Sequence, residues 1–161
     1  MKAAKRKWLI VYLWAQVIAV AAMIFFFSAQ DGEDSMRASG DVVDFLLRLL
    51  VPNFDAMAEG DRLAIYDQLQ YLVRKAAHFT EFAMLGASLR LLFHALYLRR
   101  PILWAWIVGT LYACSDELHQ MLTEARAAMW QDVAIDSAGV LTAVLLVTLG
   151  LRLRKRKRRR I

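Results

Sequence analysis

Ionisable side chains gather where three apolar segments of this chain begin or end. His78 and Glu81 stand three residues apart near the start of one segment, so on a helix they share one face. Imidazole and carboxylate groups in such pairs transfer protons or bind metal ions. The other two segments add further polar groups, one set at its end and the other at its start: Ser115, Asp116, Glu117, His119, Gln120, Asp132 and Asp136.

The set that closes the second segment lies on one side of a helix. Successive helical residues turn by about 100°, so Ser115, Asp116, His119 and Gln120 occupy a single arc. Glu117 lies near the edge of that arc. We therefore expect these side chains to face a common neighbour.

The third segment begins with two carboxylates and continues with small residues. Asp132 and Asp136 are one helical turn apart, and Gly139 and Ala143 extend the same stripe. Small side chains on a membrane helix let another helix pack closely against it. This pattern predicts that Asp136 faces neighbouring helices.

Three helices would then direct carboxylate, imidazole and amide groups at a shared pocket. All the candidates for chemistry are competent metal ligands, yet no compact motif such as HExxH is present. A divalent metal, acid–base chemistry and a hydrogen-bonded network for a lipid headgroup or sugar all stay open. The catalytic candidates are His78, Glu81, Asp116, His119, Asp132 and Asp136.

The segments that carry these residues are long enough to cross a membrane. The chain has 161 residues, of which 59% are hydrophobic, with apolar runs near 20 residues long. About 20 apolar residues cross the roughly 30 Å hydrocarbon core as a helix. We predict an all-α fold, a single membrane domain over residues 1–161 with four transmembrane helices at 8–27, 76–98, 102–122 and 132–151. The first follows four basic residues, as a signal peptide would, but its apolar stretch is too long and lacks a good cleavage site, so we expect an uncleaved helix.

Residues 28–75 form an acidic connection between the first two spans. They hold nine acidic and five basic residues, whereas the whole chain has a net charge of +6. Residues 41–51 are too few to cross a membrane but have helical spacing, which predicts a short amphipathic helix on the membrane surface or capping the bundle. A second helix at 61–74 would lead into the next span. The apolar face of the short helix comprises Val42, Phe45, Leu46, Leu49 and Leu50.

Basic residues fix the orientation. Fourteen of the 21 Lys and Arg lie in the N-terminal arm, in the Arg99-Arg100 turn and in the tail 152–161. The positive-inside rule makes these segments cytoplasmic, with both termini inside. Because the basic tail directly follows an apolar span, we expect it to contact anionic lipids rather than nucleic acid. Arg90 should extend its long side chain toward the same side as an anchor.

Several ordered motifs resemble those of the VanZ-like family of bacterial membrane proteins. The resemblance covers about residues 8–150, and the Phe27-Ser-Ala-Gln30 end of the first span is similar to a short family element. Where the family usually has Pro-Gly in the loop before an arginine, this chain reads Thr123-Glu-Ala. The matching motifs are Lys75–Glu81, Ser115–Gln120, Arg126 and Asp132–Gly139.

The resemblance implies a protein of the bacterial inner (cytoplasmic) membrane, in a family whose founding member is linked to resistance to the glycopeptide teicoplanin. Our leading hypothesis is an outward-facing pocket that binds or modifies an anionic lipid or a lipid-linked cell-wall precursor. Lys75 and Arg126 would hold its phosphate or carboxylate, with Ser115, Glu117 and Gln120 as further binding residues. The alternative is a non-enzymatic scaffold or binding protein whose polar cluster fixes helix packing. A transporter is less favoured, because the inner half offers no continuous polar path.

Overall fold

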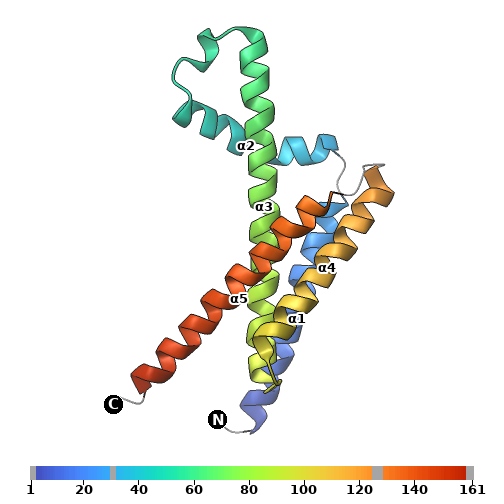
Figure 1. Cartoon of the computed structure of the whole chain (residues 1–161), viewed down its shortest axis with the longest axis vertical. Coiled ribbons are helices and arrows are strands. Elements are labelled where there is room, and N and C mark those ends of the chain that lie inside the picture. The colour runs from blue at the N-terminus through green and yellow to red at the C-terminus, as the bar shows by residue number, and fades with distance from the viewer. Residues whose placement is uncertain (1–2, 30–31, 125–128, 159–161) are drawn as a thin grey trace.

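The computed structural model describes residues 3–29, 32–124 and 129–158, and nearly all of them are helical (Figure 1). No strand occurs in these ranges, which confirms the predicted all-α class. Each predicted span falls largely within one helix. The elements are α1 (Ala3–Ser28), α2 (Gly32–Leu50), the 3-10 helix η1 (Phe54–Ala56), α3 (Glu59–Ala95), α4 (Pro101–Glu124) and α5 (Trp130–Arg158).

Local backbone signals end and restart these helices. After α2, Pro52 cannot continue the helical hydrogen bonding, and Asn53 adopts a left-handed conformation with φ of 59°. Between α3 and α4, Tyr97 and Arg100 are also left-handed, each with φ of 56°. Pro101 then opens α4, where its missing N–H costs nothing. The chain therefore reverses direction between α3 and α4 within a few residues.

Helix α3 differs from the prediction in its length. A separate helix at 61–74 followed by a span at 76–98 was expected, but the structure has one continuous helix of 37 residues that ends at Ala95. Its length is about 55 Å at 1.5 Å per residue, well beyond the roughly 30 Å of a hydrocarbon core. The N-terminal part of α3 projects past the other long helices together with η1 (Figure 1). Nothing between 61 and 95 breaks the helix, because this stretch contains no proline and its one glycine, Gly86, is tolerated.

The long helices α1, α3, α4 and α5 form a bundle whose two ends differ. The start of α1, the end of α5 and the α3–α4 turn lie at one end, and the end of α1, the start of α2, the end of α4 and the start of α5 lie toward the other (Figure 1). The C-terminal helix α5 continues through the basic tail to Arg158, since cations near a helix C-terminus interact favourably with its dipole. The buried centre is mainly aliphatic and includes Ile24, Phe82, Leu92, Val140 and Val144.

Glycines let α3 and α5 approach each other at backbone distance. A Cβ added at Gly139 would lie 2.4 Å from the carbonyl oxygen of Phe79, and one at Gly86 would lie 2.6 Å from that of Val140. No side chain fits at either position unless the helices separate. The small-residue stripe predicted on residues 132–143 is therefore confirmed as the contact face of α5.

Helix α2 packs on α3 through a face other than the one its sequence suggested. Val43 and Leu47 are buried, and the Gln70 amide of α3 donates a hydrogen bond to Ser39 Oγ at 2.7 Å. Helix α2 runs across α3 rather than along it (Figure 1). Most of the predicted apolar face stays exposed instead of covering the bundle: Val42, Phe45, Leu49 and Leu50.

The outer surface of the bundle is unusually apolar. Within the described residues, two helical stretches are long and apolar enough to cross a membrane, Ala4–Ser28 and Trp130–Arg158. Only 22% of an 18-residue apolar window in the first is buried, whereas the core helix of a soluble protein is mostly covered. Trp8, Tyr12 and Phe26 are among its exposed side chains. Apolar surface of this extent is typical of a protein that contacts lipid.

Candidate functional site

One histidine and two aspartates from three different helices meet inside the bundle. Possible ligand atoms of His78 on α3, Asp116 on α4 and Asp136 on α5 all lie within 4.8 Å of one another. Both aspartates are buried and His78 is half-buried. Gly139 lies one turn beyond Asp136 and touches Phe79, the neighbour of His78. The close crossing of α3 and α5 therefore brings the imidazole and the carboxylate together.

Asp116 is also the centre of a hydrogen-bonded group between α1 and α4. Ser28 Oγ donates to Asp116 Oδ2 at 2.8 Å. Gln120 Nε2 donates to the same carboxylate oxygen at 3.2 Å and to Ser28 Oγ at 3.2 Å. A buried carboxylate is costly unless such donors surround it. These contacts hold the Asp116 side chain in place beside His78.

A pocket of about 400 Å³ opens between α3, α4 and the start of α5. A recess of about 10 Å³ shares five of its lining residues and adds Ile135 and Asp136. A volume near 10–15 Å³ holds roughly one water or ion. The pocket thus leads from the surface toward the three-helix cluster. Its polar lining consists of Arg74, Lys75, His78, Glu117, Gln120 and Asp132.

Ionic contacts define the rim of this pocket. Lys75 forms an ion pair with Asp132, and its ammonium also lies 5.2 Å from the centre of the Tyr71 ring. The side chains of Lys75 and Asp132 are about one-fifth exposed, so the pair is partly shielded from water. Glu117 accepts a hydrogen bond from the backbone N–H of Met129 at 2.7 Å. These contacts join all three helices at the pocket rim.

Negative charge dominates around the cluster. Asp136 is repelled by Asp116, Asp132 and Glu117 and attracted by Lys75. Glu81, half-buried on α3, is repelled by Asp116. Several carboxylates that repel one another at low dielectric favour binding of a cation or a proton. The cluster can therefore hold a divalent cation through one imidazole nitrogen and two carboxylate oxygens.

Some predicted site residues lie away from the pocket. His119 does not line it; its ring stacks on Phe25 of α1 with centroids 4.5 Å apart, although it still interacts electrostatically with Asp116. Ser115 is exposed and donates to the backbone carbonyl of Tyr112 at 2.7 Å. Glu81 is near Asp116 but is not a lining residue. Arg126 lies outside the residues that the structure describes.

Three polar residues of the site were not selected from the sequence. Ser28 ends α1 and donates to Asp116, and Tyr71 and Arg74 line the pocket. Tyr71 and Arg74 precede His78 by seven and four residues, which is the spacing of one helical face, so periodicity could have identified them. Ser28 belongs to the Phe27–Gln30 element, but only the fold shows which carboxylate it meets.

The fold and the polar cluster together define an all-helical protein with lipid-compatible helices and a buried histidine–carboxylate site. The VanZ/LLP1 family model matches residues 13–151, and the chain belongs to this family. The resemblance drawn from the motifs is thereby confirmed. No curated protein and no solved structure matches the chain.

Proposed function

We propose that this protein binds a phosphate-bearing lipid or lipid-linked cell-wall precursor at the outer face of the bacterial cytoplasmic membrane, with the help of a divalent cation. The proposal rests on the convergence of His78, Asp116 and Asp136 beneath a pocket of about 400 Å³. That volume lies within the roughly 300–1,000 Å³ typical of small-molecule sites. Family membership supports a role in the cell envelope.

The proposed topology has four crossings. Helices α1 and α5 have the required length and hydropathy, and residues 76–95 of α3 together with α4 would supply the other two. His78 and Glu81 of α3 and Asp116, Glu117 and His119 of α4 lower the mean hydropathy of these two segments. An even number of crossings agrees with the position of both termini at one end of the bundle (Figure 1). The basic residues at that end make it the cytoplasmic side.

The chemistry follows from what a cation in this cluster would offer. Three protein ligands leave coordination positions open, as in catalytic rather than structural metal sites. A phosphate oxygen entering through the pocket would bind the cation, while Arg74 and Lys75 neutralise further negative charge. A cation held by His78, Asp116 and Asp136 would polarise a phosphoryl oxygen or activate a bound water, so the same arrangement would support modification of the ligand.

The competing function is a non-enzymatic scaffold. The Ser28–Asp116–Gln120 hydrogen bonds and the Lys75–Asp132 ion pair join helices without any ligand, which is what a packing role requires. In that case the pocket would result from the way the helices cross and would bind no ligand. Cation binding separates the two functions, because a scaffold needs none.

Manganese binding to the purified full-length protein tests the proposal, with electron paramagnetic resonance as the readout. We expect one Mn²⁺ per chain, and binding weakened about tenfold or more by His78→Gln or Asp136→Asn, because each removes one of three ligands. Asp55→Asn, at an exposed carboxylate on η1, is the matched control and should bind as the wild type does.

Asp136→Asn keeps the side-chain volume, so its effect on binding is separable from an effect on folding. Unchanged Mn²⁺ binding in both site variants, or no stoichiometric binding in the wild type, would favour the scaffold. The founding member of the family is linked to teicoplanin resistance, so teicoplanin susceptibility of cells that express the variants serves as a second readout.

A further inference from the structure

At the opposite end of the bundle a second cavity surrounds a buried arginine. Arg90 of α3 is 5% exposed, and its Nε donates to Thr148 Oγ1 of α5 at 2.8 Å. The sequence predicted that Arg90 would extend toward the cytoplasmic side as an anchor, and the structure shows in addition that its guanidinium is hydrogen-bonded to α5. His78 and Arg90 are separated by about 18 Å along α3, so this cavity is distinct from the site proposed above.

The guanidinium retains hydrogen-bonding capacity that the described part of the chain does not use. Thr148 donates its own hydroxyl hydrogen to the carbonyl of Val144 at 2.7 Å, so it is an acceptor for Arg90 and holds the guanidinium in one orientation. The Nη1 atom of Arg90 is buried and has no hydrogen-bond partner among the described residues. An unpaired charged donor in such a position favours an anionic ligand.

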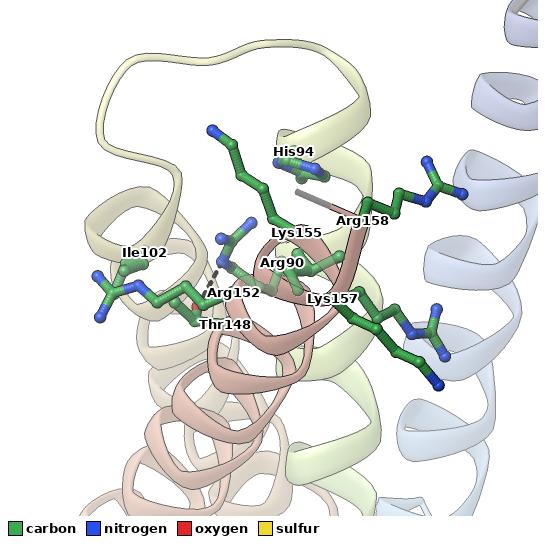
Figure 2. Close-up of a pocket in the computed structure, with 10 residues that line it drawn as sticks. Arg90, His94, Ile102, Thr148, Arg152, Lys155, Lys157 and Arg158 are labelled. Atoms are coloured by element: carbon green, nitrogen blue, oxygen red, sulfur yellow. Dashed lines mark hydrogen bonds between the residues drawn. The ribbon is translucent and has the colours of Figure 1, made fainter. Parts of the chain in front are cut away.

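The walls of the cavity carry charge of one sign. Its volume is about 1000 Å³, and none of the described residues that line it bears a carboxylate. Arg152 repels Arg90, and His94, one turn further along α3, also lines the cavity. Figure 2 shows Arg152 and Lys155 near the Arg90–Thr148 hydrogen bond, whereas Lys157 points away from it. The lining cations are Arg90, Arg152, Arg154, Lys155, Lys157 and Arg158.

An apolar groove adjoins the basic cavity. This groove, of about 360 Å³, lies between α4 and α5 and shares Ile102 with the cavity. Leu103, Trp106 and Leu141 continue its apolar lining, and Arg100 stands at its edge. A ligand that filled both spaces would have an anionic head and a hydrocarbon tail.

We propose that the Arg90 cavity is a binding site for the headgroup of an anionic phospholipid, whose acyl chain lies in the groove beside Trp106. A planar guanidinium binds two phosphate oxygens at once, which a lysine cannot do. The tail cations of α5 add attraction without fixing geometry. Specificity therefore comes from Arg90 as oriented by Thr148, and the number of surrounding charges sets only the strength of the general attraction.

Native mass spectrometry of the full-length protein in detergent tests this assignment. Phosphatidylglycerol and phosphatidylcholine with identical acyl chains are titrated against wild type, Arg90→Gln and Thr148→Val. We expect wild type to bind phosphatidylglycerol about tenfold more tightly, and Arg90→Gln to lose this preference. Arg99→Gln, at an exposed cation in the α3–α4 turn, should leave the preference unchanged.

Each other outcome overturns the proposal. A phosphatidylglycerol preference that survives in Arg90→Gln, or falls equally in Arg99→Gln, would mean non-specific attraction by the basic end. Displacement of the lipid by an equal concentration of inorganic phosphate would mean a site for free phosphate. If Arg90→Gln does not fold, Thr148→Val decides, because it keeps every charge; an unchanged preference in that variant refutes an oriented guanidinium.

Discussion

Two serines near Asp116 show how residue type and spacing differ from residue role. Ser115 adjoins Asp116 in the sequence and lies on the predicted polar arc, yet it is exposed and bonds only to its own helix. Ser28 is far away in the sequence, is buried, and donates to Asp116. The helical arc correctly grouped Asp116 with Gln120. It could not foresee that α1 would supply the missing donor.

The two serines therefore form a matched test at the scale of single residues. Ser28→Ala removes a donor to a buried carboxylate and should cost about 1–3 kcal/mol of stability. Ser115→Ala removes an exposed hydrogen bond to the Tyr112 carbonyl of the same helix and should change stability by less than about 0.5 kcal/mol. Thermal unfolding of the purified variants in one detergent measures both. Equal effects would mean that the Ser28 hydrogen bond adds nothing to the fold.

At the scale of helices, apolar run length predicted existence and approximate bounds well. The predicted span 102–122 and the observed α4 (Pro101–Glu124) nearly coincide, because Pro101 and charged residues mark the ends of the apolar run. The continuity of α3 was missed, since a change from polar to apolar composition at residue 75 resembles a boundary although no helix breaker is present. The packing face of α2 was missed as well. Periodicity finds an apolar face but not whether protein or lipid covers it.

The close crossing of α3 and α5 gives a prediction at the scale of helices. Gly139→Ala places a Cβ 2.4 Å from the Phe79 carbonyl, which is rigid backbone, so α3 and α5 must move apart. We expect a lower melting temperature and weaker Mn²⁺ binding, because the same crossing sets the distance between His78 and Asp136. Gly150→Ala on the same helix is the control. Its Cβ meets nothing within 4 Å, and alanine should stabilise the helix by up to about 1 kcal/mol.

In Gly139→Ala the melting temperature and the Mn²⁺ affinity should fall together. A lower melting temperature with unchanged Mn²⁺ affinity would show that the cluster tolerates separation of the helices, and the link between crossing and site would then be wrong. No loss of stability relative to Gly150→Ala would show that the crossing itself is easily adjusted.

Across the whole molecule, two polar sites lie toward opposite ends of an apolar helix bundle. The histidine–aspartate cluster includes residues near the end of α4 and the start of α5, whereas the Arg90 cavity is lined by residues near the ends of α3 and α5. The start and the end of α5 lie toward opposite ends of the bundle (Figure 1). The exposed apolar face of α2 suits a helix that lies in the membrane interface, because α2 runs across α3. The convergence of the three site helices followed from the order of motifs and an assumed topology. The Arg90 cavity did not, because it depends on how far α4 and α5 diverge.

Orientation in the membrane is the prediction that belongs to the whole chain. Residues in η1 and the α3–α4 turn lie at opposite ends of the bundle, and both Asp55 and Arg99 are exposed. The positive-inside rule places Arg99 in the cytoplasm and Asp55 outside. In a Cys114→Ala background, a membrane-impermeant maleimide added to intact cells should label Asp55→Cys and spare Arg99→Cys until the cells are permeabilised. Labelling of Arg99→Cys alone in intact cells would invert the orientation, and with it the assignment of the histidine–aspartate pocket to the outer face. Labelling of both would mean that the two ends of the bundle share one side, which four crossings do not allow.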